Sequence, residues 1–140
     1  MTNPTDWSAY PERPLRAAPV IDIARLATEP EPTPVGGGRE VYPALIRSLD
    51  STIDGDLITA LIARDRMGRR KYSTPLTTNN GRRAMVDALQ EVQDLLAYLE
   101  QATMEGDLSA ETTMARYHTR ACARKILRRI RAQHDGEVSP

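Results

Sequence analysis

Prolines are crowded into the N-terminal part of this 140-residue sequence: eight of the ten lie within the first 43 residues, and three consecutive glycines follow at 36–38. Proline lacks the amide hydrogen of a helix interior and clashes with the preceding turn, so helix is interrupted there repeatedly. Residues 28–38 also contain too little apolar surface to offset the entropy of ordering. The sequence therefore predicts an irregular N-terminal arm and mobile linker over residues 1–40, in which residues 20–26 can form a short strand or a helical turn.

Beyond residue 41 the apolar residues recur at helical spacing. The spacing predicts helices over about 56–67 (ending near Gly68), about 80–105 (with Asn80 as N-cap) and about 110–133 (capped by Ser109), with a short helix within 43–52. The apolar stripes of the last two long helices are Leu89, Val92, Leu95, Leu96 and Leu99, and Cys122, Ile126 and Ile130. The expected fold class is all-α: a small bundle of three to four helices over residues 41–135 that completes its core by forming a homo-oligomer, dimer or tetramer, with a disordered tail over 136–140.

Composition excludes several classes of protein. The 19 basic residues balance the 19 acidic ones, so overall charge favours neither a nucleic-acid coat nor an acidic tail. A single cysteine excludes an internal disulfide framework. No stretch approaches the roughly 18 to 20 apolar residues of a membrane span, and the N-terminus lacks a signal-peptide pattern. We expect a cytoplasmic protein with no membrane partner.

Carboxylates form a row on the predicted helix 80–105. Asp87, Glu91 and Asp94 are spaced i, i+4, i+7, which places them on one stripe, where like charges repel and need compensation. Solvent, Arg82 and Arg83, or a divalent cation could supply it. Asp65 lies on the apolar arc of the preceding helix and needs a partner. It can pair with Arg69, become exposed where the helix frays, or face the acid row as part of a metal site. If those two helices pack together, Asp65, Asp87, Glu91 and Asp94 form an oxygen-rich site suited to Mg²⁺ or Mn²⁺.

The connection between these two helices, residues 69–83, contains five cations and many hydrogen-bonding side chains. It is either an ordinary surface loop or a phosphate-binding segment. In the second interpretation Lys71 and Arg82 bind phosphates, Asn80 lies at a helix N-terminus suited to anions, and Tyr72 stacks on a base. Acids for a metal beside cations for phosphates are what hydrolysis of a phosphoanhydride requires.

Within residues 58–101 the sequence resembles a group of small phage-encoded proteins similar to the all-α, MazG-like nucleoside triphosphate pyrophosphohydrolases. The resemblance is carried by RDRMG at 64–68, KYSTPL at 71–76, NGR at 80–82 and DALQEVQDLLAYL at 87–99. It implies that Glu91 and Asp94, an E-x-x-D element, bind Mg²⁺ while water splits a nucleoside triphosphate into monophosphate and pyrophosphate. The chain departs from the family pattern, because no E-E-x-x-E element precedes Glu91 and Ser73 replaces an expected glycine.

A second interpretation concerns the last helix, whose arginines recur on one face. Residues 110–140 contain seven cations and three acids, a local charge of +4. The arginines on the helix face opposite Cys122, Ile126 and Ile130 are Arg116, Arg120, Arg124, Arg128 and Arg131. The face is either solvated or the binding surface of a non-catalytic accessory protein for nucleic acid or a host protein.

Overall fold

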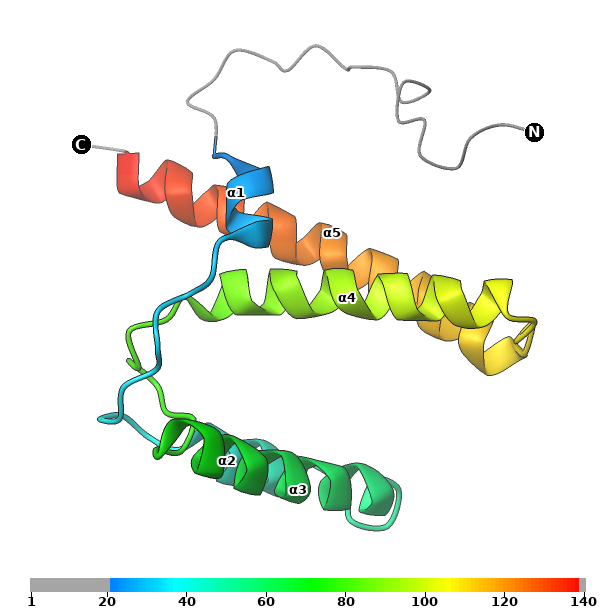
Figure 1. The fold of residues 1–140 in the computed structure, drawn as a ribbon, viewed down its shortest axis with the longest axis horizontal. Coiled ribbons are helices and arrows are strands. Elements are labelled where there is room, and N and C mark those ends of the chain that lie inside the picture. Colours follow the sequence, from blue (N-terminus) through cyan, green and yellow to red (C-terminus); the bar gives the residue numbers. More distant parts are fainter. Residues whose placement is uncertain (1–20, 139–140) are drawn as a thin grey trace.

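Five α-helices and no β-strand make up the described part of the chain, residues 21–138 of a computed structural model (Figure 1). The helices are α1 (Ile23–Thr28), α2 (Val41–Arg47), α3 (Gly55–Tyr72), α4 (Ala84–Met104) and α5 (Ala110–Val138). The all-α class is confirmed, with two short helices beyond the three long ones. The predicted arm over 1–20 and the last two residues of the predicted tail lie outside the described residues.

Helices α4 and α5 form a hairpin that contains the buried core (Figure 1). Gly106, at φ +103°, turns the chain between them, and the Ser109 hydroxyl accepts a hydrogen bond from the Thr112 amide, as predicted for a cap. All the buried hydrophobic side chains of residues 21–138 belong to this hairpin: Val86, Leu89, Val92, Ile126 and Ile130. The predicted stripes were partly wrong, because Leu95 and Cys122 are exposed. Helix α5 also continues past Gln133 to Val138, into the predicted tail.

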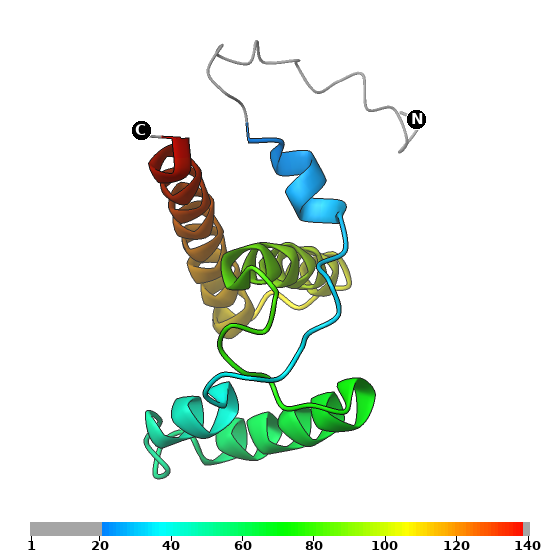
Figure 2. The same cartoon turned by 90° about the vertical axis from the view of Figure 1, so that its left-hand side faces the viewer.

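Helices α2 and α3 form a separate layer (Figures 1 and 2). Neither contains a buried residue, and α3 does not pack against α4 within the described chain. Gly68 does not end α3, contrary to the prediction, because one glycine costs a helix only about 1 kcal/mol. The helix ends instead at Ser73, whose φ of 56° is left-handed, two residues before Pro75. None of the described helices is long and apolar enough to span a membrane.

The two layers are joined by a crossing segment, residues 31–41, which runs along the loop at 73–83. Backbone bonds link Val35 to Asn80, Arg39 to Thr78 and Val41 to Leu76. The segment has no helix before Val41, but the predicted mobile linker is bonded to the loop along most of its length. The predicted cap of α4 was also wrong: the N-cap is Arg83, not Asn80.

Glu31 explains why α4 is capped at Arg83 and not at Asn80. Its carboxylate, on a side chain only 2% exposed, accepts hydrogen bonds from the backbone amide of Arg83 at 2.9 Å and from its guanidinium at 2.7 Å. A residue 52 positions earlier in the sequence thus satisfies the start of α4. The N-terminus of α4 is therefore fixed by the crossing segment.

Candidate active site

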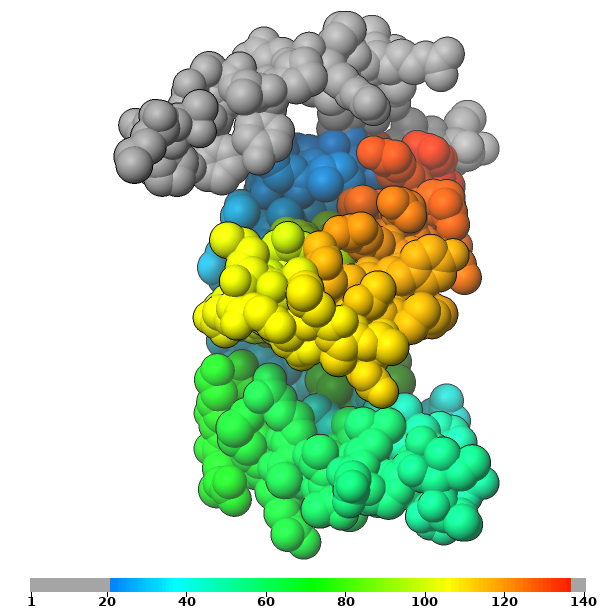
Figure 3. All heavy atoms as spheres, turned by 90° about the vertical axis from the view of Figure 1, so that its right-hand side faces the viewer, coloured from blue at the N-terminus to red at the C-terminus, as the bar shows by residue number. Residues whose placement is uncertain are grey.

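A cavity of about 270 Å³ lies where α3, the loop 73–83 and the first turns of α4 converge. Six of the residues predicted for the site line it: Asp65, Lys71, Tyr72, Arg82, Asp87 and Glu91. They come from two layers that do not pack together, so the loop and the crossing segment bring them to one place. Figure 3 shows the α2–α3 layer stacked below the α4–α5 hairpin on the face that it presents.

On the α3 side, Asp65 has the partner that its position on the helix requires. Its carboxylate accepts a hydrogen bond from Arg69 at 2.9 Å, one of the alternatives considered from the sequence, and only 17% of its side chain is exposed. Arg69 also donates to Glu40 at 2.8 Å. The carboxylates of Glu40 and Asp65 together raise the pKa of Arg69 above its ordinary value. The Asp65 carboxylate is thereby engaged in holding α3 to the start of α2.

On the α4 side, Arg82 and Asp87 form a two-pronged ion pair, with nitrogen–oxygen distances of 2.9 and 2.6 Å. Hydrogen bonding to Asp87 raises the pKa of Arg82. Arg82 also donates to the carbonyl oxygen of Pro32 in the crossing segment at 3.1 Å. Glu91, one turn beyond Asp87, is exposed and has no ion pair within the described chain. Glu91 is therefore the cavity carboxylate that is free to bind a ligand.

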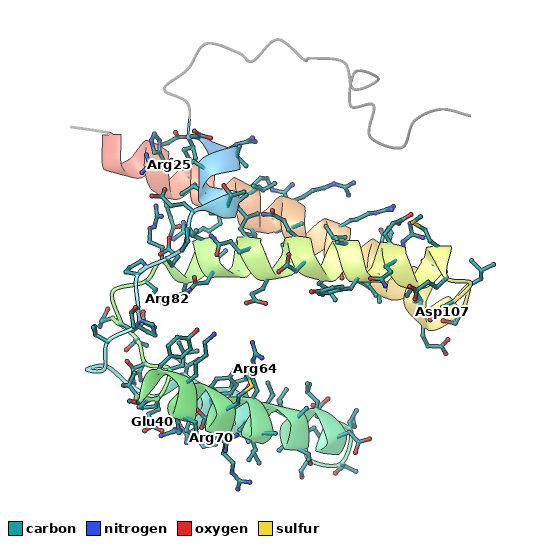
Figure 4. The ribbon with its side chains drawn as sticks, in the orientation of Figure 1. Arg25, Glu40, Arg64, Arg70, Arg82 and Asp107 are labelled. Atoms are coloured by element: carbon teal, nitrogen blue, oxygen red, sulfur yellow. The ribbon has the colours of Figure 1, made fainter. Side chains whose placement is uncertain are left out.

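Two cations of the cavity are equally free. Neither Lys71 nor Arg64 makes an ion pair with any described residue. Figure 4 shows Arg64 on the side of α3 that faces α4, whereas Arg70 points the opposite way. The Lys71 ammonium lies 5.0 Å from the centre of the Tyr72 ring, within cation–π distance. The wall thus combines cations with an aromatic face.

Two predicted residues lie elsewhere. Asp94 is exposed one turn beyond Glu91 and does not line the cavity. Asn80 is buried in the loop, where its side-chain oxygen accepts a hydrogen bond from the Arg82 amide at 3.1 Å. It shapes the loop behind Arg82 and does not face the cavity.

Sequence reasoning also missed part of the lining. Arg64 and Gln90 also line the cavity. Each comes directly before a predicted site residue, Asp65 or Glu91, and that position was the sequence signal that could have indicated them. Tyr42 and Pro34 come from the N-terminal segment, and nothing in the sequence connects them with this loop.

The carboxylates provide oxygen ligands of the kind that Mg²⁺ and Mn²⁺ prefer. Within residues 21–138, however, no three acidic, His or Cys side chains gather closely enough to hold a metal by themselves. Mg²⁺ at nucleotide sites usually takes one or two carboxylates, with water and phosphate oxygens completing its octahedron. Glu91 with Asp87 fits that pattern, whereas an all-protein metal cage does not.

Comparisons with family models, with curated proteins and with solved structures give no match for this chain. The resemblance to MazG-like proteins therefore rests on the sequence motifs alone.

Proposed function

We propose that the cavity binds a nucleoside triphosphate with Mg²⁺ or Mn²⁺ and hydrolyses it to the monophosphate and pyrophosphate. The observation that carries the proposal is the convergence of Asp65, Lys71, Tyr72, Arg82, Asp87 and Glu91 on one cavity. These residues come from α3, from the loop 73–83 and from the first turns of α4. Their convergence is what a phosphoanhydride hydrolase needs.

Five of the residues that line the cavity have a role in this reaction. Lys71 and Arg64 are uncompensated cations that neutralise phosphate charge, and Tyr72 offers a face on which a base can stack. Glu91, with Asp87 one turn earlier, would hold the metal ion, which would bind the triphosphate oxygens and lower the pKa of a bound water. In the reaction, the oxygen of water bonds to the α-phosphorus while the bond from that phosphorus to the α,β-bridging oxygen breaks. Pyrophosphate leaves with the bridging oxygen, and the proton of the attacking water passes to solvent. A whole nucleotide exceeds the cavity, so part of it would lie in the open mouth.

Exposed apolar side chains support assembly of copies of this chain. Leu57, Ile62 and Met67 of α3 and Leu95 and Tyr98 of α4 are between 36% and 66% exposed, and α3 has no buried face. Apolar surface on this scale is usually covered in an oligomer. Sedimentation equilibrium of the purified protein would show a mass above the 15.6 kDa of the monomer.

The reaction is tested by incubating the protein with each NTP and dNTP in Mg²⁺ or Mn²⁺, with and without EDTA, and separating the products by ion exchange. We expect monophosphate and pyrophosphate that disappear with EDTA. Glu91→Gln should lower kcat/KM by about 100-fold or more, because the carboxylate charge is lost while the helix is kept.

Glu105→Gln is the matched control, since Glu105 lies at the far end of α4 and outside the cavity lining. Its kcat/KM should equal that of the wild type. Asp94→Asn tests whether Asp94 belongs to the metal site. Full activity would mean that only the carboxylates of the cavity hold the metal, whereas a loss comparable to that of Glu91→Gln would mean that Asp94 also binds it. Absence of product with every nucleotide, or an active Glu91→Gln protein that keeps its helical content by circular dichroism, would contradict the proposal.

A further inference from the structure

Basic residues on α5 are segregated from acids along most of the helix. Residues 112–134 contain seven cations and no acid: Arg116, Arg120, Arg124, Lys125, Arg128, Arg129 and Arg131. Arg116 is bonded to Glu100 of α4. The other six are exposed and make no ion pair with any residue among 21–138. By contrast, Arg25, Arg69, Arg82 and Arg83 each have a carboxylate partner.

These six cations lie in two rows on the outside of the hairpin. At 100° per residue, Arg120, Arg124, Arg128 and Arg131 fall within an arc of about 80°, with neighbours about 6 Å apart along the axis. Lys125 and Arg129 form a second, shorter row about 60° further round. In Figure 4, nitrogen-tipped side chains on α5 extend away from α4.

The ridge between the two rows is made of small residues. Ala121 and Ala132 lie between them, within about 40° of the line opposite the buried Thr119, Ile126 and Ile130. The buried side and the Arg116–Glu100 ion pair hold the helix against α4, which leaves this ridge uncovered by α4. A narrow ridge with cations on both flanks is the shape that enters a groove and reaches the phosphates on either side of it.

We propose that this face of α5, the arginine face, binds double-stranded DNA through its phosphate backbone, as a surface distinct from the cavity. The major groove of B-DNA is about 12 Å wide and admits an α-helix. Arginine forks bind phosphate oxygens in pairs, and five of the six cations are arginines. Because the contacts are to phosphates, recognition is expected to be largely independent of base sequence.

Other polyanionic surfaces fit less well. Binding to a membrane requires apolar side chains that insert beside the cations, but Ile126 and Ile130 are buried against α4. Single strands are held by several stacking aromatic residues, whereas Tyr117 is the one tyrosine, tryptophan or phenylalanine in the sequence of α5, where it precedes the arginine rows. The major groove of A-form RNA is too deep and narrow to admit a helix. Duplex DNA remains the partner whose shape and charge match.

Fluorescence anisotropy with a short labelled DNA duplex at several salt concentrations tests the proposal. The wild type should bind with an affinity that falls linearly in log K against log salt, with a slope of about −0.9 for each phosphate contacted. Arg124→Glu with Arg128→Glu should weaken binding at least tenfold at about 0.1 M salt and flatten the slope by about 2. Circular dichroism would show that the double variant keeps its helices.

Arg66→Glu with Arg70→Glu is the matched control. Both residues are exposed cations on α3, spaced i, i+4, outside the cavity lining and free of ion pairs with described residues, and the charge change is the same. DNA affinity should stay within about twofold of the wild type. Equal losses in the two double variants, no binding by the wild type, or binding to anionic phosphatidylglycerol vesicles or single strands in preference to the duplex would overturn the proposal. Nucleotide hydrolysis is measured in a separate assay, so failure of DNA binding does not bear on the proposed hydrolysis, and failure of hydrolysis does not bear on DNA binding.

Discussion

The α4–α5 hairpin and the α2–α3 layer are stabilised by different physical means. The hairpin contains every buried hydrophobic side chain of residues 21–138, including Leu89 at 2% exposure. The α2–α3 layer contains none. The Arg69–Glu40 ion pair joins its two helices, and backbone hydrogen bonds join the crossing segment to the loop. Apolar burial, at about 25 cal/mol per Å², stabilises the hairpin, whereas exposed ion pairs contribute about 0–1 kcal/mol each.

This difference means that the candidate site depends on the less stably packed of the two regions, the α2–α3 layer. Lys71 and Asp65 belong to the lightly held layer, and Glu91 belongs to the hairpin. Their relative positions are set by the crossing segment and the loop, not by packing between α3 and α4. Changes in the core should therefore affect folding, while changes in the crossing segment should affect the site.

The largest effect is expected from Leu89→Ala in the hairpin core. Truncation of a fully buried leucine costs about 2–5 kcal/mol through lost burial and the remaining void. Leu57→Ala on α3, where the side chain is 49% exposed, is the matched change and should cost about 1 kcal/mol or less. Urea unfolding followed by circular dichroism measures both values. Similar losses would mean that α3 has a buried face, and the contrast between the two layers would fail.

Gly38→Ala should produce a smaller effect, located at the junction of the layers. A Cβ atom at this position would lie 2.0 Å from the carbonyl oxygen of Thr78, so the crossing segment must move away from the loop. The bonds between Arg39 and Thr78 would be lost, at about 1 kcal/mol each. Hydrogen exchange should show faster exchange at the Thr78 amide, and kcat/KM should fall if the cavity is the active site.

Gly68→Ala is the control for the exchange and stability measurements, because nothing lies within 4 Å of the added Cβ and the residue is inside α3. It is not a control for kcat/KM, since Gly68 lines the cavity. It should stabilise the protein by up to about 1 kcal/mol through helix propensity. Unchanged exchange at Thr78 in the Gly38→Ala protein would show that the crossing segment does not hold the loop.

The long helices could be predicted from the sequence because their signals are local. Apolar spacing gave α4, and Ser109 marks the start of α5. The start of α4 could not be predicted, because the carboxylate that satisfies Arg83 comes from Glu31 in a proline-rich segment. Partners distant in sequence leave no periodic pattern. Because the partners of the residues before 41 are also distant in sequence, the sequence predicts a mobile linker there.

The candidate site shows the same division between local and distant signals. Residue chemistry and spacing selected Asp65, Lys71 and Glu91, which lie along one cavity. The expected packing of the two acid-bearing helices did not occur, since that depends on which faces are covered and not on the acids themselves. Tyr42 enters the lining through a chain reversal that spacing cannot reveal.

The smallest effect, and the most specific one for the crossing segment, is expected from Glu31→Gln. Hydrogen bonds from Arg83 hold the pKa of Glu31 below its ordinary value. The folded protein therefore binds this proton less readily than the unfolded chain. The resulting stability is complete above the ordinary glutamate pKa of about 4.3 and disappears as the pH falls through the lowered value. At pH 7 the substitution should lower Tm by about 4 °C, equivalent to about 1 kcal/mol, and the difference should close below about pH 4.

Glu29→Gln provides the comparison for that measurement, because Glu29 also pairs with an arginine, Arg25, but its side chain is 47% exposed. Its Tm should stay within about 2 °C of the wild type, as for other exposed pairs. Calorimetric scans between pH 3 and 7 would give all three curves. A Tm difference for Glu31→Gln that widens toward acid would require a raised pKa in the folded state. The Glu31 carboxylate would then not be the ionised cap of α4, and the crossing segment would need another anchor on the hairpin.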